Sequence, residues 1–260
     1  MSNNYWGERA ARTQAALTDK SIKQTRKQIM LYYQSTMKKT LDNFEKTYEK
    51  IFQRILEGKE VSPADLYKLD TYWQMQYQLK QELQKLGDKQ AALLSKNFVK
   101  QFQSIYDALA IPGEAHYSTI DTAVVEQMIN QIWVADGKSW SSRIWTNTER
   151  LAETLNEHLI HCVATGKTPG ELKKLLQEDF GVSFSRADSL VRTEMAHIQT
   201  QAAKKRYDDY GIKEVEVLAD KDERRCEICG KLHEKRFPIN GEMPVPAHPK
   251  CRCTIIPVVE

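Results

Sequence analysis

The sequence predicts a mostly α-helical protein with a small zinc-stapled α+β unit at its C-terminal end. Three observations support this prediction. Residues 1–110 contain only three Gly and one Pro, so long helices can run there without interruption. Apolar residues recur at steps of three and four through most of the chain. Residues 238–260, in contrast, hold five Pro, which favours loops and short strands around a nearby cluster of Cys and His.

The N-terminal part of the chain is predicted to form antiparallel helices. An apolar seam indicates one long helix over residues 19–57. Ser62 caps a second helix, with Pro63 at its first position. We expect Gly87 to separate this helix from a third one, which ends near residue 112. Because the connections are short, neighbouring helices are expected to pack antiparallel.

The middle of the chain also consists of predicted helices. Thr168, with Glu171 three positions later, forms a capping box that begins a short helix ending near Phe180. Ser185 then caps a separate helix, which Gly211 ends. Two earlier helices are expected over residues 120–132 and 144–162.

Short strands are expected after Gly211, where the helical pattern stops. Three runs of β-branched and apolar residues predict them, over residues 215–218, 235–239 and 254–259. We therefore divide the chain into two domains. The first is a helical region over residues 1–112, and the second covers residues 115–260 and carries the Cys/His cluster.

The spacing of Cys and His near the C terminus indicates a metal site. Cys226-x-x-Cys229 is followed after 18 residues by His248, and Cys251-x-Cys253 comes next. Structural Zn²⁺ takes four N or S ligands, so these five candidates exceed the requirement by one. Cys251 and Cys253 point to the same side of an extended segment, and either His248 is the fourth ligand or this pair displaces it. We expect one zinc ion per chain. Its role is expected to be structural, because a full ligand set leaves no open position for catalysis.

Two other interpretations of these cysteines are weaker. One is that they are reduced, buried residues without a metal. The other is a redox dithiol at Cys226 and Cys229, which is disfavoured because no βαβ pattern surrounds the pair. Cys162 stands apart from the others on a helix face and is expected in the core.

A second cluster of polar residues lies on the predicted helix over residues 185–210. Its members stand three or four positions apart in pairs that can meet, and they are Arg186, Asp188, Arg192, Glu194 and His197. The main interpretation is a buried polar network that docks this helix on the sheet. Asp220 and Asp222 would then bond to Arg192 or to amides of the Cys turn. A general acid–base site is the alternative.

Charge and hydropathy exclude several classes of protein. No run of 18 apolar residues occurs, so no transmembrane helix is expected. The first residues lack an apolar h-region, so we expect no signal peptide and a reducing cytosol. The net charge of +3 is small for a dedicated nucleic-acid binder. Residues 1–50 have ten Lys and Arg against five Asp and Glu, a balance of +5, which predicts a solvated helix face or contact with an acidic surface.

Three stretches of the C-terminal half together resemble one protein family. They are LVRTEMAHIQTQAAKKRYDDYGI (190–212), LADKDERRCEICGKLHEKRF (218–237) and PAHPKCRCTIIPV (246–258), and WVADGKSWSSRIW (133–145) is a weaker addition. Their order and content resemble the Mu F-like minor head proteins of tailed phages, also called head morphogenesis proteins. The similarity covers roughly residues 115–258.

The resemblance implies a minor capsid protein of a phage or prophage that is not an enzyme. Such proteins associate with the portal protein during procapsid assembly, and other capsid or scaffolding proteins are implied as further partners. The implied locations are the host cytoplasm during assembly and the virion head, with no membrane association. We expect the helices of residues 1–112 to contact the portal or capsid.

Two alternatives from other functional classes stay open. A metal-dependent nuclease would use His233, Asp220 and Asp222, which are outside the expected zinc ligands. A DNA-binding module would use the basic N-terminal residues together with Lys204, Lys205 and Arg206.

Overall fold

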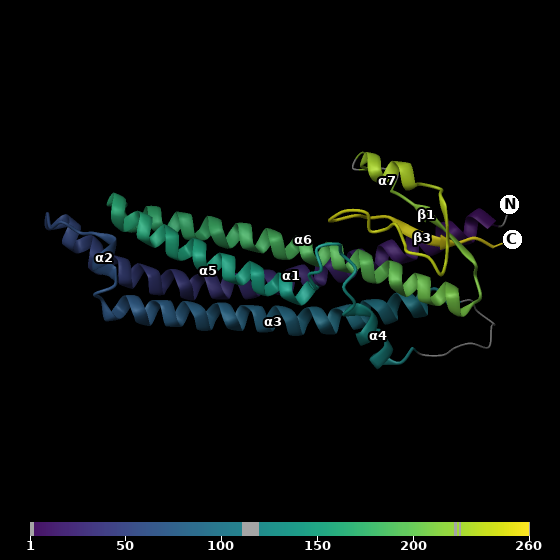
Figure 1. The fold of residues 1–260 in the computed structure, drawn as a ribbon, viewed down its shortest axis with the longest axis horizontal. Coiled ribbons are helices and arrows are strands. Elements are labelled where there is room, and N and C mark those ends of the chain that lie inside the picture. Colours follow the sequence, from purple (N-terminus) through teal and green to yellow (C-terminus); the bar gives the residue numbers. More distant parts are fainter. Residues whose placement is uncertain (1–2, 111–119, 221–222, 224, 260) are drawn as a thin grey trace. The chain divides into compact units, whose positions relative to one another are not determined.

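The computed structural model describes residues 3–110, 120–220, 223 and 225–259. These residues form a mostly helical structure with a small C-terminal antiparallel sheet (Figure 1), which confirms the predicted fold class. The elements are α1 (Asn3–Leu56), α2 (Pro63–Leu66), α3 (Asp70–Ala108), α4 (Thr122–Ile129), α5 (Trp140–Thr165), α6 (Pro169–Asp209), β1 (Glu214–Leu218), α7 (Glu227–Leu232), β2 (Arg236–Pro238) and β3 (Thr254–Pro257). Within the described ranges, no helix is both long and apolar enough to cross a membrane.

The chain forms two compact units, each built from separate segments. The sheet unit comprises residues 1–26, 93–140 and 189–260, and the helical unit comprises residues 27–92 and 141–188. The predicted domain boundary at residues 112–115 lies outside the described residues. It stays a prediction, and both units contain segments from either side of it.

The core of the helical unit combines apolar side chains with bonded polar groups. Tyr48 is fully buried, and its hydroxyl donates to the carbonyl oxygen of Cys162 at 3.0 Å and also to that of Lys167. Asn147 donates to the Tyr33 hydroxyl at 2.9 Å. Cys162 is itself completely buried, as expected for a core residue.

Two helix ends predicted from the sequence are absent because tertiary packing overrides the local signal. Gly87 does not end a helix, since α3 continues to Ala108. A Cβ atom at Gly87 would lie 2.3 Å from the ring of Trp145, so the glycine allows close packing instead. Similarly, α6 runs unbroken through residues 181–185. The buried Ser183 in that stretch accepts a hydrogen bond from Asn147 at 3.0 Å.

Helix starts and ends were predicted with mixed accuracy. The first helix begins at Asn3, well before the predicted start at residue 19, while the ends predicted at residue 57 and Gly211 lie within two residues of the observed ends. Thr168 forms the expected capping box, with its amide donating to Glu171 at 2.8 Å and its hydroxyl accepting from the Glu171 amide at 3.3 Å. Ser62 and Asp65 form another capping box, but the helix that it begins, α2, is only four residues long. The main helix of this region, α3, begins later, at Asp70.

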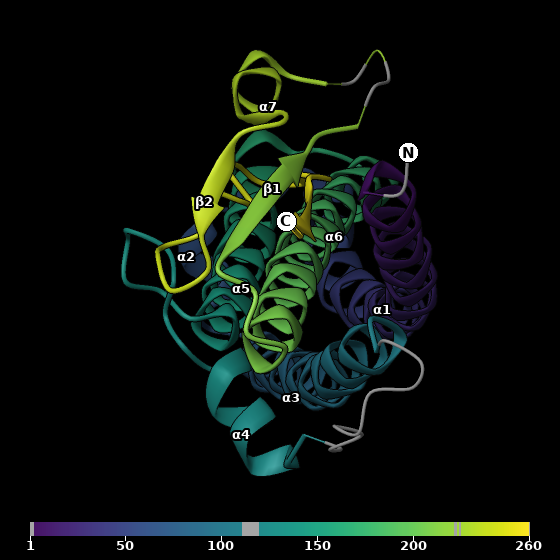
Figure 2. The same ribbon diagram turned by 90° about the vertical axis from the view of Figure 1, so that its right-hand side faces the viewer.

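The sheet unit contains the three predicted strands in the order β2-β1-β3, and both pairs are antiparallel. Figure 2 shows β2 beside β1. Val217 of β1 pairs with Ile255 of β3, and both side chains are fully buried. Gln14 of α1 is also fully buried and donates to the Ile255 carbonyl oxygen at 2.9 Å and to the Tyr207 hydroxyl at 3.2 Å. The first turns of the chain therefore contribute to the support of the last strand.

Candidate metal centre

The first pair of candidate ligands lies at the start of α7. Cys226 is the N-cap of this helix, and its Sγ accepts a hydrogen bond from the Cys229 amide at 3.4 Å. The Gly230 amide donates to the Cys226 carbonyl oxygen at 2.9 Å and closes the turn. Both thiols therefore emerge from one tight turn, with Cys229 buried and Cys226 half-buried.

The second pair lies in the turn formed by residues 248–251. The Cys251 amide donates to the His248 carbonyl oxygen at 3.1 Å. Pro249 occupies the second position, and Lys250 has a φ of 62° at the third. This combination is typical of a type II turn. The Lys250 amide donates to the Thr193 hydroxyl of α6 at 3.1 Å, which attaches the turn to that helix.

The two turns bring their donor atoms together. His248 Nε2 lies 3.2 Å from Cys226 Sγ and 3.1 Å from Cys229 Sγ, and Cys229 Sγ lies 3.7 Å from Cys251 Sγ. Cys253 completes a close group with Cys229 and Cys251, whose sulfur atoms all lie within 4.8 Å of one another. Thiolates at about 2.3 Å from a tetrahedral zinc ion would be about 3.8 Å apart. The donors form two overlapping groups, Cys226 with Cys229 and His248 and Cys229 with Cys251 and Cys253, which share Cys229. The contacts of 3.1 to 3.7 Å within them approach the spacing around a single metal ion.

The orientation of His248 also suits a metal ligand. Its Nδ1 lies 2.9 Å from the Pro249 carbonyl oxygen, which can only accept, so Nδ1 carries the proton. This leaves the lone pair of Nε2 directed toward the two thiols. A histidine ligand whose second nitrogen donates to a carbonyl oxygen is the usual arrangement at protein metal sites.

Without a cation, the surroundings of these cysteines do not favour several thiolates at the same time. Burial raises the pKa of Cys229 to about 12. A hydrogen bond from the Cys253 thiol lowers the pKa of Cys251 to about 5, while the same bond and burial raise the pKa of Cys253. A bound divalent cation would favour the thiolate form of the cysteines that contact it. The cluster could thus hold a metal ion, and the choice of ligands and the identity of the metal are not fixed by these contacts.

Two of the polar residues predicted on α6, Glu194 and His197, form a buried contact with Trp133. Trp133 stacks on the ring of His197, with centroids 4.2 Å apart and planes 6° apart, and its Nε1 donates to Glu194 at 3.1 Å. Both Glu194 and His197 are buried, and burial lowers the pKa of His197 to about 4. These contacts fit the interpretation of a buried network. Of the three other candidates, Arg186 and Asp188 belong to the helical unit and Arg192 belongs to the sheet unit.

The residues proposed for the nuclease alternative have partners within the chain. Asp220 forms an ion pair with Arg252 at 2.7 Å. His233 Nδ1 accepts from the Ala219 amide at 3.4 Å. Asp222 lies outside the described residues. The pairing of Asp220 with Arg252, next to Cys251, gives it a structural role beside the candidate ligands.

The three basic residues of α6 in the DNA-binding alternative also have partners within the chain. Lys204 donates to the Gly241 carbonyl oxygen at 2.8 Å, and Lys205 pairs with Asp209. Arg206 is buried and donates to the Tyr106 carbonyl oxygen at 2.7 Å, with its guanidinium 3.9 Å above the Tyr106 ring. Lys204 and Arg206 therefore connect α6 to other segments of the sheet unit, and Lys205 pairs within α6.

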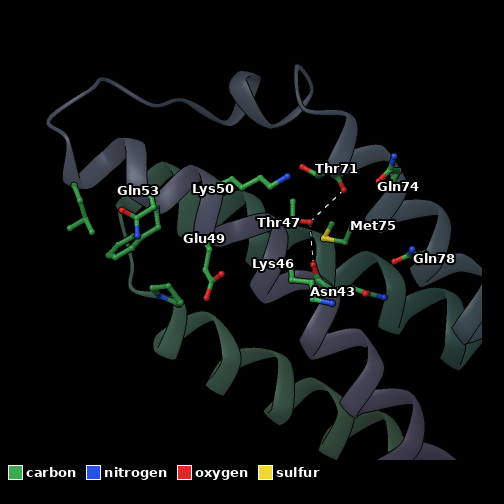
Figure 3. A pocket seen from close by; sticks show the side chains of 13 residues that line it. Asn43, Lys46, Thr47, Glu49, Lys50, Gln53, Thr71, Gln74, Met75 and Gln78 are labelled. Atoms are coloured by element: carbon green, nitrogen blue, oxygen red, sulfur yellow. Dashed lines mark hydrogen bonds between the residues drawn. The ribbon is translucent and has the colours of Figure 1, made fainter.

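A pocket of about 920 Å³ in the helical unit was not indicated by any sequence motif. Its walls come from α1, α3 and the start of α6, and its lining is a mixture of charged, amide and apolar side chains (Figure 3). Thr47 donates to the carbonyl oxygens of Asn43 and Thr71 at 3.1 and 3.4 Å within it. It contains none of the candidate metal ligands.

Comparison with known families finds a match to the segment that carries the candidate metal centre. Residues 153–256 match the family model described as "Phage Mu protein F like protein". The match covers 104 of the 260 residues, and over this segment the chain is similar to the phage Mu protein F like family. The matched range includes α6, β1, β2, all of β3 except its last residue, and all five candidate ligands. The family indicates a phage head protein. No curated protein and no solved structure gives a significant match.

The Mu F-like segment accounts for the resemblance noted in the three C-terminal stretches. The matched range begins at residue 153, so the similarity expected over residues 133–145 stays a prediction. Sequence reasoning missed the contact of Thr193 with the second turn and that of Trp133 with His197. Only the Arg-Thr-Glu stretch of the Mu F-like segment, which contains Thr193, could have drawn attention to the first.

Proposed function

We propose that the protein is a minor capsid or head morphogenesis protein of a tailed phage or prophage, and that it joins the portal protein during procapsid assembly. The observation that carries the proposal is the family match over residues 153–256. The protein acts in the cytoplasm of the bacterial host during assembly and then in the virion head. Other capsid or scaffolding proteins are its further partners.

The Cys/His cluster holds one structural Zn²⁺ per chain in this proposal. The strands have five, three and four residues, and so small a sheet needs additional support to be stable. Cation binding supplies that support, because binding free energy at such sites is folding free energy. The protein is not an enzyme in this account, since the available donors fill a tetrahedral shell.

Exposed aromatic residues support partner binding by the helical region of residues 1–112. Tyr67, Trp73 and Tyr77, here called the aromatic patch, are 47%, 56% and 66% exposed. Trp73 Nε1 donates to the Tyr67 carbonyl oxygen at 3.0 Å, which fixes the indole. Trp73 and Tyr77 are four positions apart on α3 and share a face. Aromatic residues of this kind are enriched in protein interfaces.

Co-purification with the portal protein encoded beside this chain tests the proposal. The two proteins should elute together when they are co-expressed, and Trp73→Ala together with Tyr77→Ala should weaken the complex. Leu31→Ala is the matched control, because Leu31 is 55% exposed on α1 and lies outside the aromatic patch. Separate elution of the two folded wild-type proteins would contradict portal association. An unaffected double variant would place the contact elsewhere and contradict the role of the patch.

DNA contact is the second part of the same test. The engaged residues Lys204, Lys205 and Arg206 give no support to it, which leaves the basic N-terminal residues as its basis. Binding of duplex DNA that falls steeply with salt would establish it as an additional property.

A further inference from the structure

We propose that the metal ion is held by the two turns, through Cys226, Cys229, His248 and Cys251, and that Cys253 is a positioning residue behind the ligand shell. This assignment rests on the proposed zinc binding. It names four ligands among five candidates, and it gives the fifth a separate role.

The two turns are matched in the spacing of their donors, and a backbone hydrogen bond closes each. Each supplies two donors that are three positions apart, and each is closed by an amide of its last ligand or the residue after it. The Cys251 amide bonds to the His248 carbonyl oxygen at 3.1 Å, and the Gly230 amide bonds to the Cys226 carbonyl oxygen at 2.9 Å. Two such turns facing one another supply the four ligands that a structural zinc ion requires.

Short contacts already connect the four proposed donors. His248 Nε2 lies between the two thiols of the first turn, at 3.2 and 3.1 Å, and Cys229 Sγ lies 3.7 Å from Cys251 Sγ. Each proposed donor therefore lies within 3.7 Å of a donor on the other turn. A ligand set made of the four cysteines would exclude His248, although its Nε2 is directed at two of them.

The second turn is held in a conformation that serves His248 and Cys251. Lys250 has a φ of 62°. Residues other than glycine adopt this left-handed backbone conformation only when their surroundings require it. The Thr193 hydroxyl, 3.1 Å from the Lys250 amide, holds this conformation from α6. The Pro249 carbonyl oxygen fixes the proton of His248 on Nδ1. Each of these contacts orients a proposed ligand.

Cys253 is placed by the sheet instead. The next residue, Thr254, is the first of β3 and pairs with Leu218 of β1. Cys253 is buried, and its sulfur lies within 4.8 Å of those of Cys229 and Cys251. A protonated thiol at this position can donate to a ligand thiolate, and groups that bond to ligands in this way tune metal affinity.

The test is a comparison of alanine variants of the full chain, with zinc content and the absorption spectrum of the cobalt-substituted protein as readouts. Cys253→Ala should keep one metal ion per chain and the same number of cobalt–thiolate bonds, with an affinity lower by about 10- to 100-fold. Cys251→Ala and His248→Ala should each lose stoichiometric zinc. Loss of the ion in Cys253→Ala with retention in Cys251→Ala or His248→Ala would overturn the assignment.

Zinc X-ray absorption of the wild-type protein keeps the test decisive where a variant fails to fold. The assignment predicts three sulfur atoms and one nitrogen atom around the ion, and four sulfur atoms would contradict it. A wild-type protein that binds no zinc would contradict the proposed zinc site itself. Failure of the ligand assignment and failure of zinc binding are therefore separate results.

Discussion

The helical unit and the strands of the sheet unit are stabilised in different ways. In the helical unit, long helices surround a core in which Phe44, Tyr48 and Ile51 are almost completely buried. The strands β1 to β3 are short, and beside them lie five potential metal ligands and polar anchors such as Gln14. The difference teaches that long helices can rely on packing, whereas under the proposed zinc binding so small a sheet gains stability from a cation.

Removal of one candidate ligand should have the largest effect, and it should destabilise the sheet unit much more than the helical unit. Cys229 belongs to both close groups of donors in the cluster. We expect Cys229→Ala to lose zinc and to unfold the strands, because structural zinc contributes about 10–16 kcal/mol in small zinc-binding peptides. Metal analysis and circular dichroism measure both effects.

Cys162→Ala is the matched control for that experiment. This cysteine is fully buried, but it lies in the helical unit. The variant should keep its zinc and lose about 1 kcal/mol of stability. Equal loss of structure in the two variants, or full zinc content in Cys229→Ala, would remove the proposed contrast between the units.

Acidification should weaken the sheet unit through His197. Burial lowers the pKa of His197 from 6.5 to about 4 in the folded protein. Below pH 6.5 the unfolded chain binds a proton that the folded chain does not bind, so stability falls as the pH decreases toward 4. The shift corresponds to a loss on the order of 3 kcal/mol.

His197→Phe isolates this contribution. The variant keeps a ring that can stack on Trp133 but has no titrating group. Urea unfolding at pH 7 and pH 4.5 should show a smaller loss of stability in the variant than in the wild type. Identical pH dependence in both proteins would show that His197 does not cause the loss.

A pair of glycine substitutions sharpens the description of packing in the helical unit. Gly87→Ala places a Cβ 2.3 Å from the Trp145 ring, and such overpacking costs about 1–3 kcal/mol. Gly181→Ala meets nothing within 4 Å and should stabilise α6 by about 0.5–1 kcal/mol. Thermal unfolding of both variants tests the prediction, which fails if the two changes have the same sign.

Local signals predicted the strands and the start of α6 correctly, because these depend on nearby residues. The capping box at Thr168 needs only Glu171, and strand β1 needs only its own alternation. Gly87 was misinterpreted because its function depends on Trp145, which is 58 positions away. A glycine in a helical pattern can either end the helix or admit a neighbouring ring, and the sequence alone does not distinguish these cases.

The candidate ligands were also predictable, since pairs of metal ligands commonly come from single turns. Their contacts with α6 were not, because Thr193 is 57 positions from Lys250. The stacking of Trp133 on His197 likewise depends on the course of the chain between them. The sequence therefore indicated the donor atoms of the site, and the fold supplied the groups that orient them.

Hydrogen exchange of the full chain before and after zinc removal by a chelator tests the central claim most directly. The account predicts that amides of β1, β2 and β3 lose protection without zinc, while those of residues 27–92 and 141–188 keep theirs. Unchanged protection of the three strands in zinc-free protein would contradict a structural role for the ion. Equal loss of protection in the helical unit would contradict the different origins of stability in the two units.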